Sequence, residues 1–186
     1  MLSVGILTIS DRGARGEYPD RSGPAIRKLI AERLEAEVLC TDIVPDERAV
    51  IRDKLIEWAD VQHLDLVLTT GGTGFAPRDV APEATADVVE RDAPGFAEAM
   101  RAASLRVTPH AMLSRARAGI RGRTLIINLP GSPKGAIENL STVLSAIPHG
   151  IDLLRDAAGA NTRHEYMNII RETPFPHSGD IDDLMF

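Results

Sequence analysis

Short apolar runs alternate with segments of helical character along most of the chain. Runs rich in leucine and β-branched side chains predict strands at residues 4–9, 38–44, 64–69 and 124–129. Helices are predicted between and after these runs, at residues 25–35, 49–59, 82–85, 95–104, 136–147 and 149–155. Strands that alternate with helices indicate an α/β fold, with a mostly parallel sheet covered by helices on both faces.

The 186 residues suit one domain followed by a tail. We expect the domain at residues 1–171, and a tail at residues 172–186 that is mobile or docks on a neighbouring subunit. No apolar stretch is long enough to span a membrane, and no secretory signal fits the start of the chain. A single cysteine, Cys40, excludes an intramolecular disulfide, so we expect a cytoplasmic protein.

The charge of the chain restricts its partners. The formal net charge is −6, which argues against a general nucleic-acid binder. Residues 101–123 nevertheless contain six arginines and no acidic residue. This segment either steers an anionic small molecule or is a solvated helix face, and both interpretations stay open.

A glycine-rich run is the strongest chemical signal in the chain. Residues 69–74 (TTGGTG) directly follow the predicted buried strand, and Asp79 lies a few residues later. Glycines let backbone N–H groups approach a ligand, threonine hydroxyls add donors, and a carboxylate can hold a divalent cation. The run predicts a phosphate- and metal-binding site, against the alternative of a tight turn without a ligand. Its candidate binding residues are Thr70, Gly71, Gly72, Thr73 and Gly74.

Ligands of parallel sheets bind outside the carboxyl ends of the strands. Four such ends carry polar loops that we expect to converge, at residues 10–11, 45–47, 71–79 and 130–134. Asp46 and Asp79 near a triphosphate would suit Mg²⁺. Asp46 has an alternative role as the N-cap of the next helix, and Asp79 could cap a helix or pair with Arg78.

The loop at residues 130–134 (PGSPK) places a hydroxyl and a cation at a predicted helix start. Helix N-termini attract anions, so Ser132 and Lys134 are candidates to hold a phosphate, and Ser114 with Arg115 is a weaker candidate pair. The alternative is a rigid proline turn in which Ser132 only caps the helix.

Other site classes do not fit the sequence. The glycine run lacks the lysine of a P-loop and the glycine spacing of a dinucleotide-binding motif. The five histidines show no zinc-ligand spacing, and no Gly-x-Ser-x-Gly nucleophile motif is present. Cys40 lies in a predicted strand, which favours a packing role.

Several motifs follow one another at residues 9–11 (ISD), 45–47 (PDE), 69–74 (TTGGTG), 78–80 (RDV), 82–85 (PEAT), 94–96 (PGF) and 128–134 (NLPGSPK). Together they resemble the molybdopterin adenylyltransferases, whose domain also occurs in larger cofactor proteins such as gephyrin. The resemblance covers the chain from residue 4 to residue 155.

The resemblance implies a three-layer α/β/α sandwich that forms a homotrimer. It implies transfer of AMP from Mg-ATP to molybdopterin, with release of pyrophosphate and a downstream metal-insertion protein as a possible partner. Asp46 and Asp79 would be the catalytic carboxylates and the Mg²⁺ ligands, and Asp11 with the glycine-rich loop would surround the nucleotide. Ser114, Arg115, Ser132 and Lys134 would lie toward the pterin, and Ser10, Glu83 and Gly131 complete the predicted binding residues.

Two other functions compete with this interpretation. The chain could be a non-catalytic module that binds or carries molybdopterin, which would need neither Asp46 nor Asp79. It could also act in the later metal-insertion step, although proteins of that step carry further domains. Consumption of ATP separates adenylyl transfer from carriage.

Overall fold

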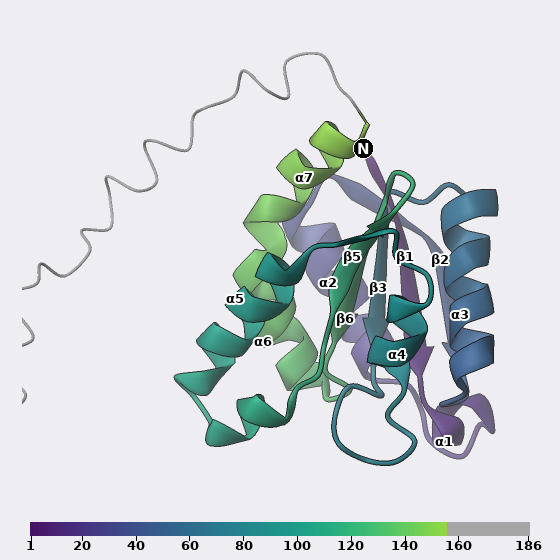
Figure 1. Ribbon diagram of the computed structural model, residues 1–186, viewed down its shortest axis with the longest axis vertical. Helices are drawn as coiled ribbons and strands as arrows, with labels where there is room; N and C mark the ends of the chain where they lie inside the picture. Colours follow the sequence, from purple (N-terminus) through teal and green to yellow (C-terminus); the bar gives the residue numbers. More distant parts are fainter. Residues whose placement is uncertain (156–186) are drawn as a thin grey trace, which may run out of the picture.

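A six-stranded sheet forms the centre of the computed structural model, which describes residues 1–155 (Figure 1). The strands lie in the order β2-β1-β3-β6-β5-β4. Their bounds are β1 (Leu2–Ile9), β2 (Ala36–Val44), β3 (Leu66–Thr70), β4 (Arg91–Asp92), β5 (Ala118–Arg121) and β6 (Thr124–Leu129). The first four strands in that order run parallel, and β5 and β4 continue the sheet in antiparallel pairing.

The four parallel strands are those predicted from the sequence, whereas β4 and β5 were not predicted. β5 reads AGIR, with a glycine and an arginine where a strand pattern needs apolar side chains. β4 has only two residues, both exposed, and main-chain bonds from Glu90 to Ile120 and from Ala93 to Ala118 flank it. The β5–β4 edge of the sheet is formed by backbone pairing between strands. Such pairing leaves no apolar periodicity in the sequence, so these strands could not be predicted from it.

Helices cover both faces of the sheet, as predicted. Helices α2, α5, α6 and α7 lie on one face and α3 and α4 on the other (Figure 1). The α-helices are α1 (Asp11–Ala14), α2 (Ser22–Arg33), α3 (Arg48–Ile56), α4 (Ala81–Ala86), α5 (Pro94–Leu105), α6 (Pro133–Val143) and α7 (Ile147–Leu154). A π-helical turn η1 (Glu57–Val61) and 3₁₀ turns η2 (Pro109–Leu113) and η3 (Leu144–Ala146) complete the described elements.

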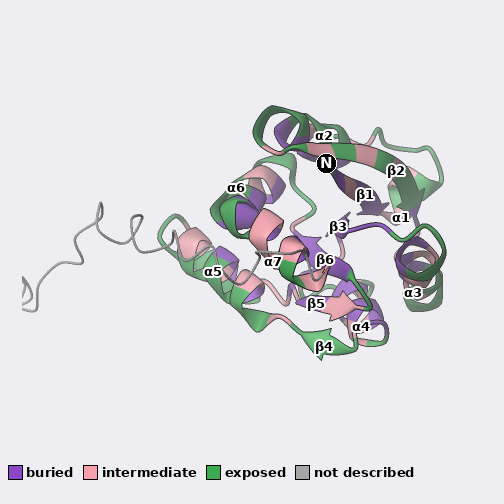
Figure 2. Cartoon of the chain, turned by 90° about the horizontal axis from the view of Figure 1, so that it is seen from above, coloured by how far each residue is buried: buried purple, intermediate pink, exposed green. Residues whose placement is uncertain are grey.

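The sheet separates two apolar cores, because consecutive strand residues point to opposite faces. In β1, Ile6 packs in the core beneath α2, α5, α6 and α7, while Leu7 packs in the core beneath α3 and α4. Both side chains are at most 1% exposed, and burial of each contributes about 1.5–3 kcal/mol. Figure 2 shows the edge strands β2 and β4 largely exposed, whereas β1, β3 and β6 are buried between the helices. This double burial explains the continuous apolar runs in the sequence.

The end of the predicted domain, residues 156–171, and the predicted tail, residues 172–186, lie outside the described residues. Within residues 1–155, no helix combines the length and apolar character that a membrane crossing requires.

Candidate functional site

Four loops meet at the carboxyl edge of the parallel strands. The N–H of Ser10, after β1, donates to the carbonyl of Val44 at the end of β2, at 2.9 Å. At the end of β3, the Thr70 hydroxyl donates to the carbonyl of Pro130 at 2.7 Å, and the N–H of the next residue, Gly71, donates to the carbonyl of Leu129 at 3.2 Å. These bonds tie the loop after β1 to the end of β2, and the loop after β3 to the loop after β6.

The glycine-rich run makes a turn that other residues would not tolerate. Gly71 has φ +105° and Gly72 has φ +61°, in the region that favours glycine. A Cβ atom on Gly71 would lie 2.2 Å from the carbonyl oxygen of Ile9, and one on Gly131 would lie 3.2 Å from the Cα of Gly71. The backbones of three loops therefore touch at this point.

Asp46 and Asp11 hold each other through their main chains. The Asp11 N–H donates to Asp46 Oδ2 at 2.7 Å, and the Asp46 N–H donates to Asp11 Oδ1 at 3.1 Å. Asp46 is not the N-cap of α3, because Glu47 occupies that position without a side-chain bond. Its carboxylate instead lies beside the glycine turn, 3.2 Å from the Cβ position of Gly72.

Asp79 lies at the other end of the glycine-rich loop. Its Oδ2 accepts the N–H of Ala76 at 2.9 Å, so it folds the loop back on itself. It neither caps α4, whose N-cap is Val80, nor pairs with Arg78. Arg78 forms two bonds of 2.7 Å to the carboxylate of Asp11, which connects the loop after β3 to the loop after β1.

The carboxylates differ in their electrostatic environment. Partial burial raises the pKa of Asp46, and the charges of Asp11 and Asp79 add to this effect against the hydrogen bond from the Asp11 N–H. The hydrogen bond from Arg78 is the main cause that lowers the pKa of Asp11. The surroundings of Asp46 therefore disfavour its negative charge. A nearby cation would stabilise the charged carboxylate.

Asp46 and Asp79 are candidate protein ligands for a Mg²⁺ ion. Among residues 1–155, no group of three or more His, Cys, Asp or Glu side chains forms a metal cage. Mg²⁺ is commonly bound by one or two carboxylates together with phosphate oxygens and water. The pair Asp46 and Asp79 would supply these oxygens on either side of the glycine-rich loop.

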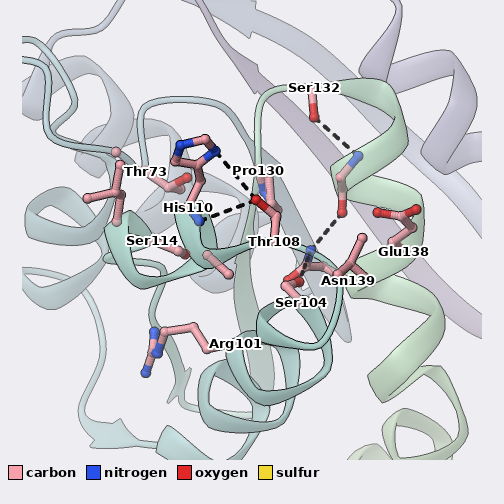
Figure 3. A pocket seen from close by; sticks show the side chains of 15 residues that line it. Thr73, Arg101, Ser104, Thr108, His110, Ser114, Pro130, Ser132, Glu138 and Asn139 are labelled. Atoms are coloured by element: carbon pink, nitrogen blue, oxygen red, sulfur yellow. Dashed lines mark hydrogen bonds between the residues drawn. The ribbon is translucent and has the colours of Figure 1, made fainter.

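Two cavities share the glycine-rich loop as a wall. The first cavity, of about 400 Å³, is lined by Ser10, Tyr18, Asp20, Arg21, Asp46, Thr70, Gly71, Gly72 and Gly131, among others. The second cavity, of about 320 Å³, is lined by Thr73, Gly74, Arg101, Ser104, His110, Ser114, Ser132, Glu138 and Asn139, among others (Figure 3). Successive residues of the loop therefore face different cavities.

The remaining predicted residues lie in different surroundings. Ser132 lines the second cavity and also caps α6, because its hydroxyl accepts the Gly135 N–H at 3.1 Å. The side chain of Lys134 is 80% exposed, has Glu138 at 3.8 Å and lines neither cavity. Ser114 lines the second cavity, whereas the guanidinium of Arg115 bonds to Glu83 and to two carbonyls of the glycine-rich loop.

The six arginines of residues 101–123 do not form one anion-binding face. Arg121 pairs with Asp60 at 2.6 Å and Arg117 with Asp92 at 3.7 Å. Arg101 alone among the six lines the second cavity, where it donates to the carbonyl of Ala116 at 2.9 Å. The solvated helix face is not observed either, because most of these arginines follow η2 rather than lie on a helix.

Sequence reasoning missed several cavity residues. Ser104 and Asn139 come from α5 and α6 and are joined by a hydrogen bond of 3.1 Å across 35 positions, which no local motif announces (Figure 3). Tyr18 lines the first cavity, and the guanidinium carbons of Arg12 and Arg21 lie 5.0 and 5.5 Å from its ring centroid. Two cations near one aromatic ring were a readable signal in residues 12–21.

Comparison with known proteins decides the family. A model described as a probable molybdopterin binding domain matches residues 5–149. The chain belongs to this molybdopterin-binding family. A molybdopterin adenylyltransferase of Helicobacter pylori is 48% identical over 154 residues, which cover 82% of this chain and 88% of that protein. One of Escherichia coli K12 is 45% identical over 155 residues, with coverage of 81% and 80%.

A solved structure supports the same assignment for the fold. The molybdopterin biosynthesis enzyme MoaB of Thermus thermophilus is 55% identical, with a TM-score of 0.79. The match covers 83% of this chain and 96% of the MoaB chain. This chain, as a member of the molybdopterin-binding family, therefore has the α/β fold expected from its sequence.

Proposed function

We propose that this chain adenylylates molybdopterin with Mg-ATP in molybdenum cofactor biosynthesis. The observation that carries the proposal is the glycine-rich loop, which lines two cavities, with Asp46 beside its turn and Asp79 at its end. A transfer reaction needs places for two substrates and a charged centre between them. The identity to molybdopterin adenylyltransferases over four-fifths of the chain supports the same activity.

The first cavity is proposed to hold the nucleotide and the second the pterin. Ser10, Asp46 and the turn at residues 70–72 lie around the first, where backbone N–H groups can bind phosphates. Ser114 and Ser132 lie around the second, where their hydroxyls can orient the pterin or its phosphate. The α-phosphorus of ATP would then lie near residues 72–74, where the two cavities adjoin.

In the proposed reaction a terminal phosphate oxygen of molybdopterin attacks the α-phosphorus of ATP. A phosphorus–oxygen bond forms there, and the bond between the α-phosphorus and the bridging oxygen breaks, with its electron pair leaving on pyrophosphate. The attacking oxygen is already anionic at neutral pH, so the reaction needs no general base. The task of the protein is to align two anions and to offset their repulsion.

Each charged group has a separate part in this task. Bound Mg²⁺ would neutralise phosphate charge near the α-phosphorus, with Asp46 and Asp79 as its protein ligands. Asp11 would position Asp46 through the reciprocal main-chain bonds, rather than by contact with the nucleotide. Lys134, whose side chain is exposed, would attract the substrate phosphates through its positive charge.

The proposal extends to assembly and location. By its resemblance to the family, we expect a cytoplasmic homotrimer that delivers adenylylated molybdopterin to a downstream metal-insertion protein. Exposed apolar side chains such as Leu39 and Met112 are available for contacts between proteins. Light scattering of the purified full chain would give the oligomeric state, and a mass of one or two chains would contradict the trimer.

The central test is incubation of the full-length protein with molybdopterin and Mg-ATP. Formation of pyrophosphate and adenylylated pterin in equal amounts would support the proposed reaction. The same mixture with EDTA in excess should give neither product, and added Mg²⁺ should restore both. Tight pterin binding without ATP turnover would instead support a carrier function.

A further inference from the structure

Arg115 bonds to the glycine-rich loop through both its side chain and its backbone. Its Nε donates to the carbonyl of Gly74 at 2.7 Å, and its backbone N–H donates to the carbonyl of Thr73 at 2.9 Å. Its Nη2 donates to the carbonyl of Asp79, and its Nη1 forms an ion pair with Glu83. One side chain thus bonds both ends of the segment from Gly74 to Asp79.

Few other contacts fix the segment from Gly74 to Asp79 to the rest of the protein. Residues 75–78 are exposed, so no apolar core fixes them. Asp79 folds the loop through its bond from Ala76, but that bond lies within the loop and does not attach it to the rest of the protein. Arg78 attaches the loop to Asp11 through a side chain that is 57% exposed, where ion pairs contribute little.

Glu83 gives Arg115 a fixed partner on the sheet side. It lies in α4, whose residues Ala81 and Ala84 are fully buried in the core beneath α3 and α4. The other carboxylate oxygen of Glu83 is buried without a hydrogen bond, and the Arg115 guanidinium is in direct contact with this carboxylate. The guanidinium is therefore held at one end by a rigid element and holds the loop at the other.

We propose that Arg115 is a positioning residue that fixes the loop carrying Asp79, and does not bind substrate. The proposal rests on the proposed function, in which Asp79 is a Mg²⁺ ligand. Each of the three guanidinium nitrogens donates to a protein acceptor, and Arg115 lines neither cavity. The adjacent Ser114 does line the second cavity, so the same short segment connects the pterin side to Asp79.

The test compares Arg115→Lys with wild type in adenylyl transfer. Lysine keeps the positive charge and the backbone bond to Thr73, but it cannot serve three acceptors in the fork geometry of a guanidinium. Misplacing Asp79 should lower kcat by about a hundredfold. The KM for molybdopterin should stay within about twofold, because no substrate contact is lost. The Mg²⁺ concentration for half-maximal rate should rise.

Arg117→Lys is the matched control. Arg117 lies two positions away, its side chain pairs with Asp92 at 3.7 Å, and its backbone N–H donates to Asn128 rather than to the glycine-rich loop. Its substitution should leave kcat, KM and the Mg²⁺ requirement unchanged. Thermal unfolding and molybdopterin binding by fluorescence should show that Arg115→Lys is folded and still binds the pterin.

The outcomes separate this inference from the proposed function. If wild type forms no adenylylated pterin, the proposed function fails. If wild type is active and Arg115→Lys is equally active, Arg115 has no positioning role. A rise in the KM or dissociation constant for molybdopterin with kcat preserved would overturn the inference in favour of direct substrate contact. A lower kcat, an unchanged KM and a higher Mg²⁺ requirement would support it.

Discussion

Asp11 and Asp46 exchange main-chain hydrogen bonds: each carboxylate accepts the backbone N–H of the other, at 2.7 and 3.1 Å. This exchange joins the ends of β1 and β2, and Arg78 extends the connection to the loop after β3. In the proposed function, a carboxylate fixed in this way would need no adjustment when Mg²⁺ and phosphates bind. Such preorganisation is an efficient source of electrostatic catalysis.

Replacement of Asp79 by asparagine should remove most activity without unfolding the protein. Asparagine is similar in shape and its carbonyl can still accept the Ala76 N–H, but it cannot contribute negative charge to a cation. Adenylyl transfer should fall by at least about a hundredfold. The exposed Asp53→Asn on α3 is the control and should be fully active. Full activity of Asp79→Asn with a normal Mg²⁺ requirement would contradict the role.

Replacement of Asp46 by asparagine should stabilise the ligand-free protein at neutral pH. The pKa of Asp46 is raised in the folded state, so the folded protein holds its proton more tightly than the unfolded chain. The wild type therefore loses stability as pH rises from the unfolded value of 3.8 through the raised folded value. Asparagine carries no such penalty.

Urea unfolding of the wild type and Asp46→Asn at a series of pH values from about 4 to about 7 tests this sign. The stability of the variant relative to wild type should increase across the series. Activity should nevertheless be lost, since asparagine is a poor ligand for Mg²⁺. A variant whose relative stability does not change with pH would show that Asp46 is not in an unfavourable environment.

Replacement of Gly71 by alanine should be strongly destabilising. The new Cβ would lie 2.2 Å from the backbone oxygen of Ile9, at a φ of +105° that alanine rarely adopts. We expect a loss of about 3–5 kcal/mol in the free energy of unfolding. Gly95→Ala is the control, because its Cβ meets nothing within 4 Å in the first turn of α5. That variant should be unchanged or more stable by up to about 1 kcal/mol.

A buried polar network joins β6 to β3 and α4. The Asn128 amide donates to the hydroxyls of Thr69 and Thr85 at 2.9 and 2.8 Å, and all three residues are fully buried. Asn128→Ala would leave these groups with fewer partners, at a cost of about 2–4 kcal/mol. Thr142→Ala, which removes one exposed bond, should cost much less. Equal melting temperatures for the two variants would show that the network contributes little.

The sequence predicts the parallel part of the sheet well, because strands buried on both faces form continuous apolar runs. Ile6 and Leu7, neighbours in β1, pack into the cores on opposite faces. The sequence locates Asp46 and Asp79 because loops that follow parallel strands meet at one edge. It does not predict the surroundings of Arg115, whose partners Glu83 and Gly74 lie 32 and 41 positions away. From the sequence, the pair Ser114 and Arg115 predicts an anion-binding site. The structure shows that the guanidinium donates to protein acceptors instead.

The wall shared by the two cavities has a consequence for turnover. Adenylylated molybdopterin would extend from one cavity to the other past Thr73 and Gly74, and would gain the contacts of both sides at once. Joining two ligands makes the second binding event intramolecular, so the product would bind more tightly than either substrate. Its departure, rather than the chemical step, would then limit the rate, and a protein that withdraws the product would accelerate the cycle.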